Sequence, residues 1–268
     1  MPPHVKIKLL LKKLLPEQIF GIVLKLWRKT LAPFFAYNPD QKYYDLYVAE
    51  KGLVVSGGPF VGMKYIEESA GSVLFHKLVG YYESILHPTL EQIKNEKYDT
   101  IIDIGCAEGY YLVGLGRYLS DVHLIGYDID ERALTLVEKL ASENNLKNKV
   151  TLDKKCTPEK LSAQITPNTL LICDAEGFEE KILNPEICPA LLNVKKMIIE
   201  THDFAAPSVE KKLKDRFSKS HEISSVTYQM AETDKYPFLQ QISNNRDLYY
   251  LLRERGEQEQ VWLIMTKK

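Results

Sequence analysis

The stretch YDTIIDIGCAEG at Tyr98–Gly109, followed by GYDID at Gly126–Asp130, decides the fold class. A run of β-forming residues, Thr100–Ile104, passes into a turn that carries two glycines, and a second apolar run ends in Asp128. This order predicts a strand, a tight turn, a helix and a second strand tipped by a carboxylate. Doubly wound α/β domains hold a nucleoside in this way. The turn lets the backbone approach the ligand, and an acid about 20 residues further on accepts the ribose hydroxyls.

From Tyr98 onward, short apolar runs alternate with helical patterns. We expect seven strands, over residues 100–104, 123–127, 150–152, 170–173, 197–200, 222–227 and 261–266. Between them we expect helices over 110–119, after Asp130 as N-cap, after Pro158, over 208–217 and over 247–255. Strands separated by helices form parallel sheets with right-handed crossovers. The sequence therefore predicts an α/β fold with a mostly parallel sheet flanked by helices.

Composition limits the classes of function. The 268 residues suffice for one large domain, or for a domain with an extension. A net charge of −1 gives no overall electrostatic footprint for nucleic acid, so we expect no nucleic-acid partner. The four cysteines include no C-x-x-C pair, which favours a reduced chain in the cytoplasm. No apolar run reaches the roughly 18 residues of a membrane-spanning helix, and Lys12 and Lys13 interrupt the stretch that a signal peptide needs.

The first 97 residues differ in character from the rest, so we place a domain boundary between residues 97 and 98. Residues 4–30 are basic and amphipathic, and predict a helical extension. Its lysine face suits a peripheral contact with the inner face of a membrane, but it equally suits a helix that caps the core. Residues 31–97 predict a loop and helix, a short strand and turn, and a helix that ends near Lys97. This Tyr-rich segment is expected to form a lid or substrate wall.

The turn at Gly105–Gly109, which reads GCAEG, favours S-adenosylmethionine over NAD as cofactor. Ala107 stands where dinucleotide-binding turns carry a middle glycine. Glu108 would repel an anionic pyrophosphate, whereas the positive sulfonium and amino groups of S-adenosylmethionine would be attracted. We expect Asp103 and Glu108 to lie near that charge. The cofactor-binding residues expected in this stretch are Asp103, Gly105, Cys106, Glu108 and Gly109.

Three further residues are expected at the adenosine. Asp128 is placed to accept hydrogen bonds from both ribose hydroxyls, and Ile129 to pack on the adenine. Cys156 follows the third strand, where the edge of an adenine is usually contacted. A strand-end acid such as Asp128 can also cap a helix or lie on the surface, and that interpretation stays open here.

Acids also follow the fourth and fifth strands, which would meet at one edge if these strands are neighbours. Asp174 and Glu176 come after the strand at 170–173. Glu200 ends the strand at 197–200, and His202 follows two residues later. We expect His202 to act as general base on a hydroxyl, with Glu176 or Asp174 as the alternatives; Asp174 can also orient the methyl donor. Helix caps and a structural histidine are the competing interpretations.

The same acids and His202 suggest a metal-assisted variant. Asp174, Glu176, Glu200 and His202 can together hold Mg²⁺, which would polarise a sugar diol. Loss of activity on chelation is what would distinguish this variant from proton removal alone.

Four motifs in this order and spacing resemble the FkbM-like family of S-adenosylmethionine-dependent methyltransferases: DIGCAEGYY, GYDID, DAEGFEEKIL and IIETHD. The family hallmark D-x-E-G-x-E is matched by Asp174, Glu176, Gly177 and Glu179. The resemblance covers residues 98–230, and departs from the common family loop at Ala175 and Phe178. It implies a Rossmann-like class I fold whose seven-stranded sheet has a reversed last strand. It also implies O-methylation of sugars or of natural-product hydroxyls.

We therefore expect an S-adenosylmethionine-dependent O-methyltransferase that acts on a small-molecule or glycan acceptor, including a glycolipid precursor. Two rivals remain at this stage. One is a non-catalytic scaffold of the same fold in a glycan-assembly complex, and the other is an NAD-dependent oxidoreductase. The carboxylates at Asp103, Asp128, Asp174 and Glu176 argue against the scaffold, and the missing middle glycine argues against NAD.

Overall fold

The computed structural model describes residues 37–203, 208–253 and 261–268. The helices and strands of these residues belong to Asp40–Lys268, the second of the two units into which the chain divides. Residues 4–30, for which a membrane contact and a core cap were both expected, lie outside the described residues. The domain boundary between residues 97 and 98 stays a prediction.

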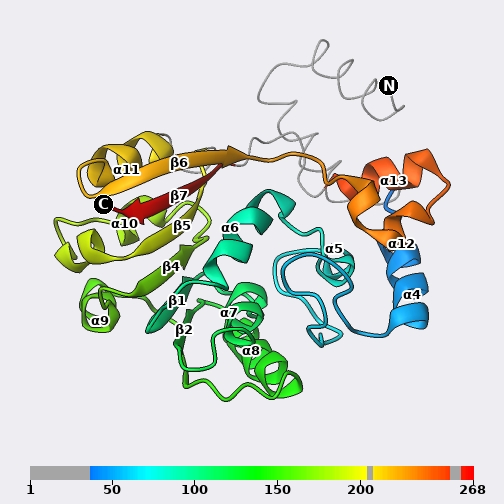
Figure 1. Ribbon diagram of the computed structural model, residues 1–268, viewed down its shortest axis with the longest axis horizontal. Helices are drawn as coiled ribbons and strands as arrows, with labels where there is room; N and C mark the ends of the chain where they lie inside the picture. The colour runs from blue at the N-terminus through cyan, green and yellow to red at the C-terminus, as the bar shows by residue number, and fades with distance from the viewer. Residues whose placement is uncertain (1–36, 204–207, 254–260) are drawn as a thin grey trace, which may run out of the picture. The chain divides into compact units, whose positions relative to one another are not determined.

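Seven strands form one sheet in the order β3-β2-β1-β4-β5-β7-β6 (Figure 1). Their bounds are β1 Thr100–Ile104, β2 His123–Tyr127, β3 Val150–Asp153, β4 Thr169–Cys173, β5 Lys196–Thr201, β6 His221–Thr227 and β7 Val261–Lys267. Strands β1 to β5 pair in parallel, and β7 runs antiparallel to both β5 and β6. The predicted α/β class and the reversed last strand are confirmed.

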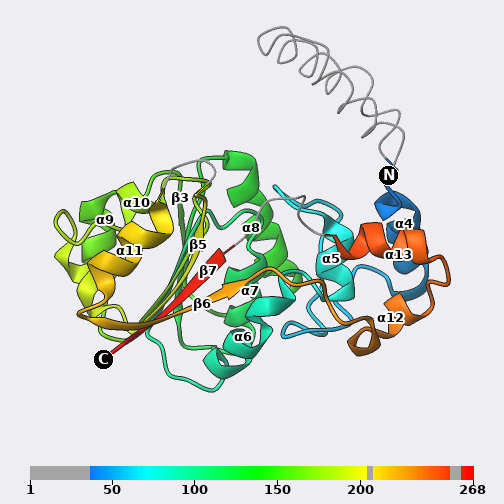
Figure 2. The same ribbon diagram turned by 90° about the horizontal axis from the view of Figure 1, so that it is seen from above.

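Helices cover both faces of this sheet (Figure 2). One face carries α6 (His87–Ile93), α7 (Tyr110–Gly116) and α8 (Glu131–Glu143). The other carries α9 (Pro158–Gln164), α10 (Glu179–Ile182) and α11 (Val209–Phe217). Successive strand residues point to opposite faces, so Ile101 packs in one core and Ile102 in the other. Burial on both faces explains why β1, β4 and β5 are continuous apolar runs.

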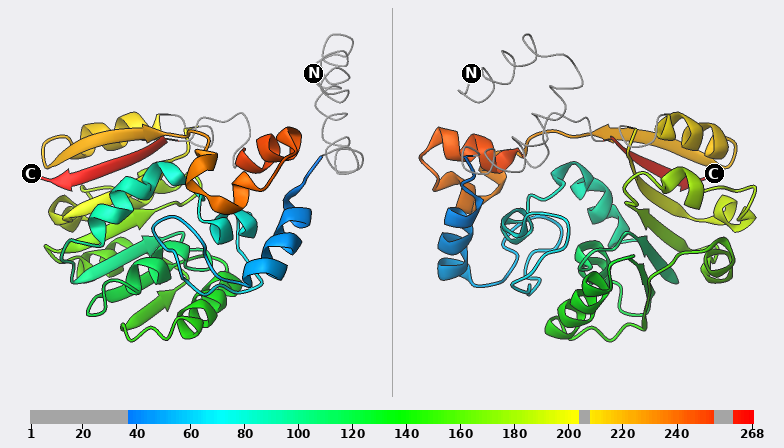
Figure 3. Two further views of the ribbon diagram at one scale, coloured as in Figure 1. Left: turned by 45° about the vertical axis from the view of Figure 1, so that its right-hand side comes forward. Right: turned by 180° about the vertical axis from the view of Figure 1, so that it is seen from behind.

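Two segments far apart in the sequence pack together beside α6–α8 (Figure 3). They contain the helices α4 (Asp40–Lys51), α5 (Leu74–Val79), α12 (Pro237–Gln240) and α13 (Asn245–Leu252). The ring of Phe75 meets those of Tyr47 and Phe238 edge to face, at 6.3 and 5.8 Å between centroids. The Tyr43 hydroxyl donates a hydrogen bond of 2.8 Å to Asp247, which is buried. The polar stretch after β6 therefore completes the N-terminal segment.

The prediction of a single helix that ends near Lys97 is wrong. It is divided into α5, the 3₁₀ helix η1 (Ser84–Leu86) and α6. Gly80 ends α5 with a left-handed φ of +95°, and a Cβ at Gly80 would lie 2.1 Å from the carbonyl oxygen of Gly57. The break therefore lets the Gly57 loop pass against α5. Two further 3₁₀ helices are η2 (Pro189–Asn193) and η3 (Thr233–Lys235).

None of the described helices is both long enough and apolar enough to cross a membrane. All four cysteines carry free thiols, so the described unit folds without a disulfide. The short segment around Gly58 is closed by a single antiparallel bridge between Val54 and Lys64, where a short strand and turn were expected.

We predict that Gly80→Ala destabilises the fold by roughly 2–4 kcal/mol, because the new methyl group adds overpacking to left-handed strain. Gly52→Ala is the matched control. Gly52 also has a positive φ, +68°, but no atom lies within 4 Å of its added Cβ. Only the cost of left-handed strain, about 1 kcal/mol, is expected there. Urea unfolding measures both, and equal losses in the two variants would contradict the close approach at Gly57.

Candidate active site

A cavity of about 540 Å³ lies at the carboxyl ends of β1, β2 and β4. This is the point where the strand order reverses, since β1 has β2 on one side and β4 on the other. Eight of the predicted site residues line it: Asp103, Gly105, Cys106, Asp128, Ile129, Cys156, Asp174 and Glu176. Its far side is formed by a segment that we call the N-terminal wall: Ala70, Gly71, Ser72, Lys77 and Tyr82. Tyr110 and Tyr111, at the start of α7, lie next to the wall in the lining.

The turn after β1 is shaped by contact with the loop after β4. Gly105 has a φ of +80°, and a Cβ on it would lie 1.8 Å from the carbonyl oxygen of Asp174. No side chain fits there, so this glycine sets the distance between the two loops. Ala107, in place of the expected middle glycine, still adopts a left-handed φ of +47°. Gly109, with a φ of +91°, then begins α7.

The backbone orients the carboxylate of Asp128. The Ala107 N–H donates to Oδ2 and the Asp130 N–H donates to Oδ1, each at 2.9 Å. Each oxygen keeps a further lone pair, so the carboxylate can still accept from a diol in the cavity. Ile129 beside it is 90% exposed and lines the cavity. Cys156 is half-buried, which raises the pKa of its thiol to about 12 and keeps it neutral.

Asp103 is a strongly perturbed acid in the cavity lining. It is 2% exposed, and its Oδ2 has no hydrogen-bond partner among the described residues. Burial raises the pKa of Asp103 to about 8, and the nearby carboxylates of Asp174 and Asp128 add to the shift. A cation in the cavity would relieve both effects, because an opposite charge favours the ionised form. The position therefore fits the amino or sulfonium group of the expected cofactor.

Glu108 does not line the cavity, although a contact with the cofactor was expected. It is fully buried and forms an ion pair with Lys77, and it accepts from the Ser69 hydroxyl and the Ala70 N–H, each at 2.9 Å. Burial raises the pKa of Glu108, but Lys77 and the hydrogen bonds outweigh it, so the net direction is downward. Glu108 therefore attaches the N-terminal wall to the turn after β1. Its role toward the cofactor stays a prediction.

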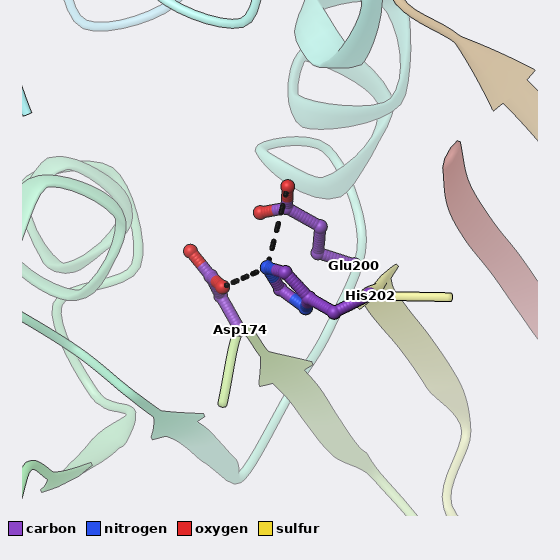
Figure 4. A group of neighbouring side chains, drawn as sticks. All are labelled: Asp174, Glu200 and His202. Carbon is purple, nitrogen blue, oxygen red and sulfur yellow. Dashed lines mark ion pairs between the residues drawn. The ribbon is translucent and has the colours of Figure 1, made fainter. Parts of the chain in front are cut away.

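A second cluster gathers behind the cavity, where β4 and β5 end (Figure 4). The expected meeting of the two acidic loops is confirmed, because β4 pairs in parallel with β5. The Nε2 atom of His202 lies 3.5 Å from Oδ1 of Asp174, 3.6 Å from Oε2 of Glu176 and 3.7 Å from Oε1 of Glu200. His202 is 1% exposed and does not line the cavity, whereas Asp174 and Glu176 do.

Glu179, outside the expected catalytic set, holds the other side of this imidazole. Its Oε1 lies 2.8 Å from Nδ1 of His202 and also accepts the N–H groups of Ala175 and Gly177 at 3.0 and 3.1 Å. Burial raises the pKa of Glu179, but His202 and the backbone N–H groups of Gly177 and Glu179 outweigh this effect, so the net direction is downward. Burial lowers the pKa of His202, yet Glu179, Asp174 and Glu176 raise it overall. The hallmark acid at this position was the sequence signal for that role.

A family model described as a methyltransferase domain matches residues 95–256. The chain belongs to this family. Its fold is the Rossmann-like methyltransferase fold, and the family implies use of S-adenosylmethionine, which the buried Asp103 and the accepting Asp128 fit. No curated protein matches the sequence.

Three solved structures are similar in part. A human methyltransferase 10 domain containing protein shows a TM-score of 0.47 at 12% identity, covering 85% of this chain and 96% of that one. A precorrin 8w decarboxylase from Methanobacterium thermoautotrophicum shows 0.46 at 16%, covering 69% and 89%. An rRNA methylase from Streptococcus thermophilus shows 0.46 at 14%, covering 68% and 95%.

We predict that Lys77→Met destabilises the protein by about 3–5 kcal/mol, because it leaves the buried Glu108 charge without its cation. The double variant Lys77→Met/Glu108→Leu should recover much of that loss, since both charges are then removed. Lys235→Met is the control; its partner is Glu232, and both side chains are more than 60% exposed. There we expect a change within about 0.5 kcal/mol. Urea unfolding measures the free energy of unfolding of all three variants. A double variant as unstable as Lys77→Met alone would contradict the role of the Lys77–Glu108 ion pair.

Proposed function

We propose that this protein transfers a methyl group from S-adenosylmethionine to a hydroxyl of a sugar, glycan or glycolipid precursor, as the FkbM-like resemblance implies. One observation carries the proposal. A single cavity joins an adenosyl-type end, Asp103 and Asp128, to an acidic end, Asp174 and Glu176. The first pair suits a cationic nucleoside, and the second suits a hydroxyl that must lose a proton.

Each end of the cavity has a specific task in this proposal. Asp128 accepts the ribose hydroxyls, and Ile129 covers the adenine, which would explain why so apolar a side chain stands exposed. Asp103 faces the positive charge of the methionine part. The methyl group would then point toward the end of β4, where Asp174 reaches the lining. Positioning a hydroxyl oxygen in line with the sulfonium methyl supplies most of the acceleration.

In this proposal, Asp174, Glu176 and His202 remove the proton from the acceptor hydroxyl. As the new C–O bond forms, the C–S bond breaks with its electron pair on sulfur, and the hydroxyl proton passes to the protein. Asp174 and Glu176 contact the cavity, while Nε2 of His202 lies 3.5 Å behind Asp174. His202 is therefore assigned as the final acceptor through Asp174, and the hydroxyl itself meets the carboxylates.

The acceptor class is supported by the aromatic lining. Tyr82, Tyr110 and Tyr111 line the cavity beside the N-terminal wall. Aromatic faces next to carboxylates suit a polyhydroxylated ring, whose apolar side can stack while its hydroxyls donate.

Two rival functions, an NAD-dependent oxidoreductase and a scaffold with no ligand, are disfavoured. A pyrophosphate would meet the buried acid Asp103, and a scaffold would leave Asp103 and Asp128 without a role. The basic segment 4–30 suits an acceptor at a membrane surface.

We predict that the protein binds S-adenosylmethionine and S-adenosylhomocysteine but not NAD in calorimetric titrations. Asp128→Ala should weaken donor binding at least about tenfold, or 1.4 kcal/mol, because the diol loses its acceptor. Asp121→Ala is the control, since this exposed acid precedes β2 at the opposite edge of the sheet. Binding of NAD alone, or equal affinities in the two variants, would sink the proposal.

We also predict that His202→Gln lowers turnover by about 10²–10⁴-fold while sparing donor affinity, as expected when proton transfer is lost. Release of S-adenosylhomocysteine over a panel of hydroxylated glycans measures the rate, and donor titration checks the fold of the variant. Undiminished turnover in His202→Gln would show that the base lies elsewhere.

A further inference from the structure

The cluster behind the cavity has the spacing of a metal site. The ligand atoms of Asp174, Glu200 and His202 all lie within 4.8 Å of one another. From Nε2 of His202, the oxygens of Asp174 and Glu200 are 3.5 and 3.7 Å away. These distances exceed those of a normal hydrogen bond. Four ligands placed tetrahedrally about 2.1 Å from a metal are about 3.4 Å apart, which is close to the two distances from Nε2.

The orientation of the imidazole is a second, independent observation. Oε1 of Glu179 already accepts two backbone N–H groups, so the Nδ1 of His202 is the donor in their 2.8 Å hydrogen bond. In the neutral ring, Nε2 then carries the lone pair and directs it toward the carboxylates. A buried carboxylate that orients a histidine from behind is the usual outer partner of a metal-bound imidazole.

The acidic character of the cluster also favours a bound cation. Four carboxylates, those of Asp174, Glu176, Glu179 and Glu200, surround one imidazole that carries at most one positive charge. Within this cluster of five side chains, four carboxyl groups therefore face a single basic group. Glu200 is 2% exposed, and His202 1%, so water screens their part of the cluster poorly.

We propose that Asp174, Glu200 and His202 bind a divalent transition-metal ion in preference to Mg²⁺, with Glu176 as a further ligand from the cavity side. The imidazole decides the class of metal, because nitrogen ligands suit zinc and its neighbours whereas Mg²⁺ prefers oxygen alone. The role of the ion, to polarise the acceptor hydroxyl, rests on the methyl transfer proposed above; its binding does not. With an ion on Nε2, His202 serves as a metal ligand in place of the final proton acceptor assigned above. Turnover falls in His202→Gln in both cases, so the metal titration decides between the two roles.

The test is metal binding by the full chain after chelation and dialysis. Calorimetric titration with Zn²⁺, Mn²⁺ and Mg²⁺ should show one site per chain, at least tenfold tighter for Zn²⁺ or Mn²⁺ than for Mg²⁺. Asp174→Asn, Glu200→Gln and His202→Gln should each weaken it tenfold or more. His123→Gln should not, because His123 starts β2 at the opposite edge of the sheet. Absence of a stoichiometric site, equal affinity for Mg²⁺, or equal losses in His123→Gln would overturn the proposal.

Two further measurements keep the result clear. Co²⁺ added to the unaltered chain should give the intense visible absorption of a four- or five-coordinate site, which needs no variant to fold. A weak, six-coordinate spectrum would count against the site. Titration of the same samples with S-adenosylmethionine separates the two proposals: donor binding without metal binding overturns this inference and leaves the proposed function, and the reverse overturns the proposed function alone.

Discussion

The parallel pairing of β1 with β2 and β4, and of β4 with β5, is the constraint on which the rest of the site depends. It brings the carboxyl ends of four strands to one edge, and an acid stands at or beyond each of them: Asp103, Asp128, Asp174 and Glu200. Acids in such a place are costly to ionise: burial is the main cause of the raised pKa of Asp103, and the neighbouring carboxylates of Asp174 and Asp128 add to it. The fold tolerates the cost because backbone N–H groups and one imidazole compensate part of it. A cationic ligand in the cavity would compensate the part of this cost that remains.

The second constraint is the buried pair of Lys77 and Glu108. A buried ion pair adds little net stability, but it fixes which groups must lie together. Here it holds the N-terminal wall against the turn after β1. Gly105, in the same turn, packs closely against the loop after β4. Lys77 also lies 5.1 Å from the ring centroid of Tyr82, so the aromatic lining depends on the same contact. One turn therefore positions both the cofactor end and the acceptor end of the cavity.

The sequence predicted the centre of the sheet well because β1, β4 and β5 are buried on both faces, so that apolar residues follow one another along them. Strands β1 and β2 begin and end where they were expected. Asp130 caps α8 as predicted, with its side chain accepting from the Arg132 N–H. The break at Gly80 was missed, since the glycine is needed by a long-range contact with Gly57 and not by a local pattern.

The site was predicted in part for the same reason. Residues placed by strand ends were found, because topology alone brings Asp128, Asp174 and His202 to one edge. The interaction of Glu108 with Lys77 was not foreseen, since the partners are 31 residues apart and nothing in the local sequence marks a buried lysine. Glu179 was visible only as a motif position, and its contact with His202 needed the three-dimensional structure.

The most direct test of the central claim is a crystal structure of the protein with S-adenosylhomocysteine. The account predicts the ligand in the cavity at the ends of β1, β2 and β4, with both ribose hydroxyls within hydrogen-bond distance of Asp128 and the amino group facing Asp103. A ligand bound elsewhere, or a ribose that does not contact Asp128, would contradict it.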